Sequence, residues 1–123
     1  MKYLLDSVIV IDHLNGIGAA TSLIQRHGRD LAISAITRVE VLAGLDDEAA
    51  ELAAALLDQF PFLPMDAAVA DEAARIRRRT RLRLPDAVQA ATALRHGLEL
   101  MTRNTRDFAA GKFPFVVVPY RLA

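Results

Sequence analysis

Four carboxylates could do chemistry in this chain, because each stands beside a segment whose composition predicts burial: Asp6, Glu40, Asp86 and Asp107. A lone charge in such a place has a desolvation penalty of several kcal/mol. If the four side chains converge, each close pair adds a repulsion of roughly 4 kcal/mol at an intermediate effective dielectric constant. A bound divalent cation would relieve both costs. The pattern therefore predicts an acidic metal site suited to phosphodiester chemistry.

Two of these acids follow predicted strands. Asp6 ends the apolar run 3–5, and Asp107 comes after the apolar segment 98–101. In an open parallel sheet, ligands bind beyond the carboxyl ends of the strands, so we expect both acids at one edge of the sheet. Each acid also has an ordinary explanation. An aspartate after a strand often caps the next helix, as Asp6 could, and Asp107 could shape a turn.

The other two acids fall on predicted helices. Asp86 follows a proline in a first helical turn, where the helix dipole favours an ionised carboxylate whether or not it has a further role. Glu40 lies on a helical stripe that also contains Ile36, Val39 and Ala43. Because charged side chains are seldom buried without a partner, we expect Glu40 to be buried and neutralised.

Alternating strands and helices must position these acids. Strands are predicted at 3–5, 31–33, 98–101 and 115–118, with a weaker extended segment at 60–63 that contains a proline. Helices are predicted at 8–14, 19–27, 35–42, 48–57, 67–80 and 86–96, with Ser34 and Asp66 as N-caps. Short apolar strands separated by helices predict an α/β domain with a mainly parallel sheet.

Composition narrows the class of protein. A chain of 123 residues fits a single domain, which we place at 1–123. Without cysteine there is neither a disulfide nor a thiolate metal site. A formal net charge of zero argues against a protein that simply coats nucleic acid. We expect a cytoplasmic protein with no membrane contact, because no stretch of about twenty apolar residues occurs and the start has no signal-peptide pattern.

Four segments resemble, in order, the motifs of PIN-domain proteins: LLDSVIVI at 4–11, ISAITRVEVLAG at 33–44, LPDAVQAATAL at 84–94 and LMTRNTRDF at 100–108. Their order, their spacing and the total length resemble the VapC toxins of bacterial type II toxin–antitoxin modules. The resemblance implies a three-layer α/β/α fold with a mainly parallel central sheet. It also implies an endoribonuclease that depends on Mg²⁺, with Mn²⁺ as an alternative, and that a VapB-type antitoxin silences.

The same resemblance implies roles for individual residues. Asp6 and Asp86 would be the principal metal ligands, and Glu40 and Asp107 would complete the site, partly through water. The supporting positions would be Ser7, Thr102 and Asn104. The chain departs from many relatives at Ser7-Val8, where they carry Thr-Asn, so the hydroxyl is kept and the amide is lost.

Arginines are the second notable feature, since lysine occurs only at Lys2 and Lys112. Arginine suits the bidentate recognition of phosphate. The run from Arg75 to Arg83 could be a solvated helix face, but we favour a role in guiding RNA to the metal. The candidate RNA contacts are Arg38, Arg79, Arg81, Arg103 and Arg106, and the family points toward transfer or ribosomal RNA.

The histidines bear on the mechanism. His13, His27 and His96 are all expected at exposed helix ends, so no histidine is placed to act as a general base in an attack by a 2′-hydroxyl. We therefore predict direct hydrolysis by a metal-activated water. The Asp12–His13 pair is expected to be a polar helix end, because its two members point to different helix faces.

Alternative functions remain open from the residues alone. An aspartyl-nucleophile phosphatase could use Asp6, but it wants a second aspartate two residues later, where this chain has Val8. A receiver domain meets the same objection. A catalytically inactive PIN-like scaffold for RNA or a partner would be expected to have lost one or more of the acids. The apolar segment 8–23 either packs on the sheet or forms a homodimer seam or an antitoxin groove.

Overall fold

The central sheet has five strands, and every neighbouring pair is parallel. A computed structural model describes residues 1–108 and 112–122. The strands are β1 (Tyr3–Leu5), β2 (Leu31–Ser34), β3 (Phe62–Leu63), β4 (Glu99–Met101) and β5 (Val116–Val117). They lie in the order β3-β2-β1-β4-β5, so the first strand in sequence is central and is bordered by β2 and β4.

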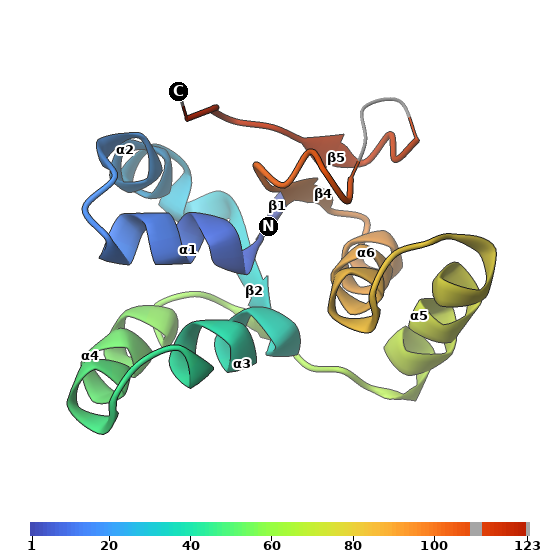
Figure 1. Ribbon diagram of the computed structural model, residues 1–123, viewed down its shortest axis with the longest axis horizontal. Helices are drawn as coiled ribbons and strands as arrows, with labels where there is room; N and C mark the ends of the chain where they lie inside the picture. The colour runs from blue at the N-terminus through green and yellow to red at the C-terminus, as the bar shows by residue number, and fades with distance from the viewer. Residues whose placement is uncertain (109–111, 123) are drawn as a thin grey trace.

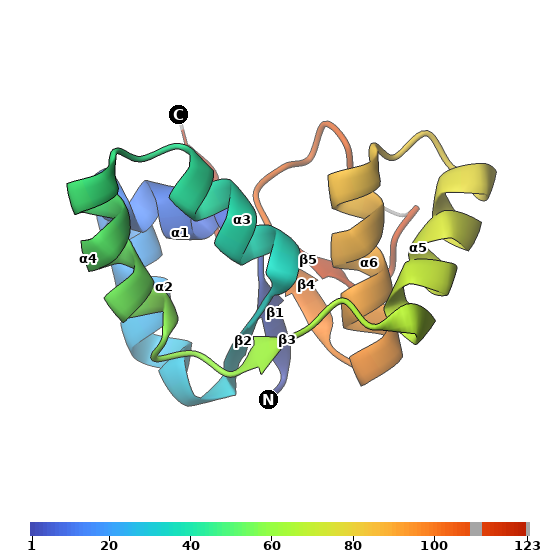
Figure 2. The same ribbon diagram turned by 90° about the horizontal axis from the view of Figure 1, so that it is seen from below.

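Helices cover both faces of this sheet, as Figures 1 and 2 show. One face carries α1 (Ser7–Leu14), α2 (Gly18–His27), α3 (Ala35–Ala43) and α4 (Asp47–Leu57), and a short 3₁₀ turn at Gly28–Asp30 leads into β2. The other face carries α5 (Ala67–Arg79) and α6 (Leu84–His96). The predicted three-layer α/β/α arrangement is confirmed.

Alternation along the strands divides the core into two clusters. On β1, Leu4 packs with the residues of α5 and α6, whereas Leu5 packs with those of α1 to α4. On β2, Ala32 belongs to the first cluster, and its neighbours Leu31 and Ile33 belong to the second. Successive side chains of a strand point to opposite faces, and both faces are covered here, so short and continuously apolar strands are stable.

Side-chain caps set where the helices begin. The Ser34 hydroxyl accepts a hydrogen bond from the Thr37 amide at 3.1 Å, and Asp66 accepts one from the Val69 amide at 2.9 Å. Both predicted N-caps are therefore confirmed. At the other end of α6, Gly97 takes the left-handed conformation at φ 65°, which ends the helix just before β4.

The predicted burial of one stripe of α3 was wrong. Ile36 of this stripe packs against the core, but Glu40 is exposed and Val39 is 60% exposed. The buried residues of α3 are Thr37 and Val41 instead. Helical periodicity shows which residues share a face, but it does not show which face the sheet covers.

Within the described residues, no single helix is long and apolar enough to cross a membrane. One strongly bent pair of consecutive helical segments, Ser7–Leu14 and Gly18–Asp30, would be long and apolar enough when taken together, by length and composition only.

Candidate active site

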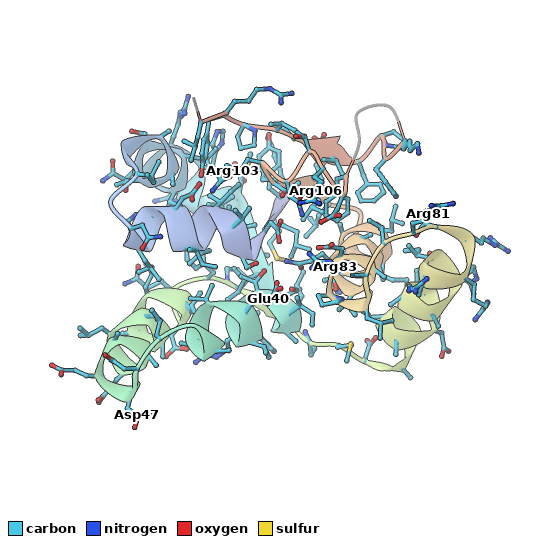
Figure 3. All side chains as sticks on the ribbon, in the orientation of Figure 1. Glu40, Asp47, Arg81, Arg83, Arg103 and Arg106 are labelled. Carbon is cyan, nitrogen blue, oxygen red and sulfur yellow. The ribbon has the colours of Figure 1, made fainter. Side chains whose placement is uncertain are left out.

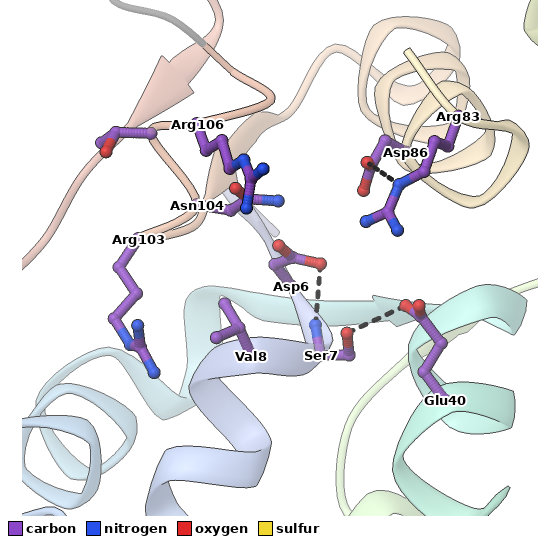
Figure 4. Close-up of a pocket in the computed structure, with 10 residues that line it drawn as sticks. Asp6, Ser7, Val8, Glu40, Arg83, Asp86, Arg103, Asn104 and Arg106 are labelled. Carbon is purple, nitrogen blue, oxygen red and sulfur yellow. Dashed lines mark hydrogen bonds and ion pairs between the residues drawn. The ribbon is translucent and has the colours of Figure 1, made fainter.

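A polar cavity of about 400 Å³ opens beyond the carboxyl end of β1. Three of the four predicted acids line it, Asp6, Glu40 and Asp86, and they come from three different elements (Figure 4). The remaining lining residues are Ser7, Val8, Arg83, Arg103, Asn104, Thr105 and Arg106. The sheet edge predicted from the parallel strands is therefore where these carboxylates meet.

Hydrogen bonds fix both carboxylate oxygens of Asp6, which lines the cavity. One carboxylate oxygen, Oδ1, accepts a hydrogen bond from the Ser7 amide at 2.9 Å and another from the Gln89 side-chain amide at 2.9 Å. The other oxygen, Oδ2, accepts a hydrogen bond from the Thr102 hydroxyl at 2.6 Å. Asp6 is thus the N-cap of α1, as one of its two explanations predicted, and it also lines the cavity.

Gln89 is a site residue that sequence reasoning missed. It is only 1% exposed, and its amide nitrogen donates to Asp6 and to the Thr37 hydroxyl at 2.8 Å. Its carbonyl accepts a hydrogen bond from the Ser34 hydroxyl at 2.6 Å. The available signal was the position of Gln89 three residues after Asp86, which puts an uncharged polar side chain on the same helix face.

Asp86 has the least satisfied carboxylate in the cavity. The residue is 8% exposed, and its Oδ2 atom has no hydrogen-bond partner within the described part of the chain. The nearest cation is Arg83, whose Nε lies 3.7 Å from that oxygen (Figure 4). Burial, followed by the negative charges of Asp107 and Asp6, raises the pKa of Asp86 to about 6, and Arg83 opposes this shift.

Glu40 and Asp107 flank the cavity on different sides. The Ser7 hydroxyl donates to Glu40 Oε1 at 2.9 Å, which aims this exposed glutamate at the cavity (Figure 4). Asp107 does not line the cavity. It accepts a hydrogen bond from the Asn104 side-chain amide at 2.9 Å and lies 3.5 Å from Arg83 Nη2. Its charge still acts on Asp86.

The donor set fits a hard cation. Carboxylate oxygens are the ligands that Mg²⁺ and Mn²⁺ prefer, and the unpaired Oδ2 of Asp86 offers one of them directly. Among residues 1–108 and 112–122, no group of three acidic or histidine side chains stands close enough together to enclose an ion. The site therefore provides carboxylates from separate elements around a cavity, with ample room for water ligands.

The comparisons with known proteins decide the family. The family model described as PIN domain matches residues 3–113. The chain belongs to the PIN-domain family. It is 34% identical to Ribonuclease VapC19 of Mycobacterium tuberculosis over 129 aligned residues, covering 95% of this chain and 98% of that protein.

Solved structures agree with this assignment. A chain in the structure of a toxin–antitoxin complex from Klebsiella pneumoniae is 36% identical, with a TM-score of 0.88, and the match covers 98% of this chain and 100% of that one. The structure of FitAcB from Neisseria gonorrhoeae is 27% identical, with a TM-score of 0.78 and coverage of 98% and 99%. The likeness thus extends over nearly the whole PIN domain described here.

In this PIN domain an ion pair holds the loop after β4, which lines the cavity, against α1. Arg103 contacts Asp12 through two nitrogen–oxygen pairs at 2.6 and 2.8 Å, and the Tyr120 hydroxyl donates to the same carboxylate at 2.8 Å. The hydrogen bond from Arg103 holds the pKa of Asp12 below its usual value. Asp12 and His13 lie in the last turn of α1 and contact different partners, as predicted, and Asp12 is only 4% exposed there. Its partners lie about ninety residues or more away in sequence, beyond the reach of helical spacing.

The five candidate RNA contacts fall into two groups. Arg103 is held by Asp12, and Arg38 forms an ion pair with Asp58 at 2.9 Å. The other three, Arg79, Arg81 and Arg106, are exposed, and none of them forms an ion pair within the described residues. Two arginines of the predicted run are also engaged: Arg75 pairs with Glu72, and Arg83 pairs with Asp86 and Asp107.

No histidine is found among the described residues that line the acidic cavity. His96 is exposed, as predicted. The other two are half-buried, which corrects the prediction: His13 Nδ1 lies 2.7 Å from the Thr21 hydroxyl, and the His27 ring packs edge-on against Tyr3 at 5.5 Å. The His13 ring therefore joins α1 to α2, and the His27 ring packs α2 against β1.

Proposed function

We propose that this PIN domain is a metal-dependent endoribonuclease, the toxin of a type II toxin–antitoxin module. The observation that carries the proposal is the convergence of Asp6, Glu40 and Asp86 on one cavity in which an oxygen of buried Asp86 has no hydrogen-bond partner among the described residues. The likeness to a ribonuclease of Mycobacterium tuberculosis supports RNA as the substrate, and the likeness to a toxin–antitoxin complex of Klebsiella pneumoniae supports an antitoxin partner.

The residues of the cavity would divide the work. Asp6 and Asp86 would hold Mg²⁺ or Mn²⁺, with Glu40 and Asp107 acting partly through water. When bound, the ion would acidify its water ligands and stabilise the charge that develops on the scissile phosphate. Gln89 and Thr102 fix the Asp6 carboxylate through their hydrogen bonds, so this ligand needs no reordering when the ion binds. Ser7 does the same for Glu40.

Hydrolysis by water fits the side chains better than attack by a 2′-hydroxyl. The second route wants a positioned general base, and the described lining of the cavity contains carboxylates and arginines but no histidine. Two of the three arginines of the lining, Arg83 and Arg106, can balance the charge of the phosphate without transferring a proton. An aspartyl-nucleophile reaction is disfavoured further, because both oxygens of Asp6 already accept hydrogen bonds.

The partners follow from the same proposal. A VapB-type antitoxin would bind the toxin and block cleavage, and the PIN domain would act as a homodimer. Exposed apolar side chains on α1 and α3, among them Leu14 and Val39, are available for such contacts. Co-expression with a VapB-type antitoxin, sought as a small open reading frame beside the gene for this chain, should give a co-purifying complex that no longer cuts RNA. Light scattering of the isolated chain should give the mass of a dimer.

The test is RNA cleavage by antitoxin-free protein, with Mg²⁺, with Mn²⁺ and with EDTA. Asp6→Asn is the informative variant, because asparagine caps a helix about as well as aspartate and keeps the shape of the side chain. Asp71→Asn on α5 is the matched control, since Asp71 is exposed and lies outside the cavity. We expect cleavage that requires metal, disappears in Asp6→Asn and persists in Asp71→Asn.

Two results would overturn the proposal. Metal-loaded protein that binds but cuts no transfer or ribosomal RNA would favour an inactive binding scaffold. Cleavage that survives both EDTA and Asp6→Asn would mean that the acidic cavity is not the active site.

A further inference from the structure

A second cavity lies next to the acidic one, and cations predominate in its lining. It has a volume of about 590 Å³ and is lined by Arg79, Thr80, Arg81, Leu82, Arg106, Asp107, Lys112 and Phe113. We call it the basic pocket. Four of its eight lining residues are cations, and Asp107 is the single acid among the described residues that line it. In Figure 3, Arg81 and Arg106 extend from the α5–α6 turn and from the loop after β4.

No described residue forms an ion pair with the cations of the basic pocket, which are Arg79, Arg81, Arg106 and Lys112. Asp107 contributes little to balance them, because it already contacts Arg83 and accepts a hydrogen bond from Asn104. Clustered like charges repel one another, so an anionic ligand would stabilise this arrangement.

The two cavities are continuous in their lining. Arg106 lines both of them. Asp107 lines the basic pocket and also contacts Arg83, which lines the acidic cavity. A polyanion held with one phosphate in the acidic cavity would therefore extend its neighbouring phosphates over the basic pocket. Half-buried Phe113 adds an apolar ring to the lining, where it packs edge-on against Phe108 and Phe115.

We propose that the basic pocket binds the backbone phosphates of the RNA strand on one side of the scissile bond. The inference rests on the proposed function, and it separates the expected RNA contacts: Arg79, Arg81 and Arg106 bind phosphate, while Arg38 and Arg103 stabilise the fold through Asp58 and Asp12. Phosphate contacts position a nucleic acid without reading its sequence, so the pocket sets affinity and register while specificity lies elsewhere.

The experiment measures binding without cleavage. A fluorescently labelled single-stranded RNA oligonucleotide is titrated with antitoxin-free protein in EDTA, over a series of salt concentrations. The test variant is Arg79→Gln/Arg81→Gln. The matched control is Arg77→Gln/Arg78→Gln, which removes the same charge from the last turn of α5, next to the test positions but outside the basic pocket.

We expect the test variant to lose roughly tenfold in affinity at moderate salt, with a salt dependence reduced by about 1.4 in log–log slope, since each lost contact to a single strand contributes about 0.7. The control should retain the slope of the wild type. Equal losses in both variants would show that only the net charge around the end of α5 matters, and an unchanged test variant would show that the pocket does not bind RNA. Either result overturns the inference.

The outcome is separable from that of the proposed function. If the wild type cuts RNA with Mn²⁺ while Arg79→Gln/Arg81→Gln binds RNA with unchanged salt dependence, the nuclease stands and the pocket assignment fails. If no RNA is cut but only the test variant loses RNA affinity, the pocket assignment stands and the proposed nuclease activity is refuted. Circular dichroism of both double variants checks that the fold is retained.

Discussion

Replacing Asp86 with asparagine should make the metal-free protein more stable. The carboxylate has no hydrogen bond to Oδ2 within the described residues. Burial and repulsion by Asp107 and Asp6 raise its pKa from 3.8 to about 6. The folded protein thus favours the neutral acid. Asparagine has nearly the same shape as that neutral acid, so Asp86→Asn removes the penalty of ionisation and leaves the packing unchanged.

The sign and size follow from proton linkage. In the unfolded chain Asp86 ionises above its ordinary pKa of 3.8, while the folded protein keeps the proton until about pH 6. The folded state binds more protons in this window, so its stability falls as pH rises from about 4 to about 6. A shift of roughly two units at about 1.4 kcal/mol each gives a penalty of up to about 3 kcal/mol at pH 7.5 and about half of that at pH 5.

The assay is urea unfolding of antitoxin-free protein in EDTA, followed by circular dichroism at pH 7.5 and at pH 5. Asp86→Asn should raise the free energy of unfolding by up to about 3 kcal/mol at the higher pH and by clearly less at the lower pH. Asp71→Asn, which alters an exposed carboxylate, should change it by less than about 0.5 kcal/mol at either pH. A variant that is no more stable than the wild type at pH 7.5, or one with the same gain at both values, would refute the reasoning.

Other expected outcomes concern the ion and its surroundings. Adding Mn²⁺ should raise the melting temperature of the wild type but not that of Asp86→Asn, and an equal rise in both would place the ion elsewhere. Arg83→Gln should tighten Mn²⁺ binding severalfold by calorimetry, because the guanidinium of Arg83 competes with the ion for Asp86 and Asp107; weaker binding would contradict this competition. Gln89→Leu should cost about 1–3 kcal/mol in urea unfolding by leaving buried partners unpaired, and it should weaken Mn²⁺ binding. Tyr120→Phe should cost about 1.5–3 kcal/mol by the same measurement, since it removes a hydrogen bond to the buried charge of Asp12, and a change near zero would mean that water replaces it.

The sequence predicted the parts of this site that depend on chain direction. Asp6 follows an apolar strand and Asp86 opens a helix, and in a parallel sheet both positions lie at one edge, so their convergence could be anticipated. The predicted burial of Glu40 was wrong because helical periodicity does not identify which face of α3 the sheet covers. Gln89 was missed because an uncharged amide on an apolar face does not announce its partners, which are Asp6, Thr37 and Ser34.

Contacts between distant segments were beyond prediction for a different reason. Asp12 and Arg103 are 91 residues apart in sequence. Each stands beside another polar residue, so the local sequence gives no reason to expect a distant partner. Only the packing of the loop after β4 against α1 brings them together, and Tyr120 reaches the same carboxylate from the segment after β5. The pair then removes Arg103 from the set of free cations, which composition alone counted as available for RNA.

The balanced net charge is the clearest case of a total that hides an arrangement. A formal charge of zero argued against a protein that simply coats nucleic acid, yet it counts ion pairs such as Arg38–Asp58 and Arg75–Glu72 that produce almost no field at a distance. Some of the remaining charges are sorted by the fold into an acidic cavity and an adjoining basic pocket that share Arg106. A phosphodiester strand needs both signs side by side, a cation site at the bond to be cut and fixed positive charge for its neighbours. Charge separation over a short distance is therefore the relevant quantity for this fold, and it requires no excess of either sign.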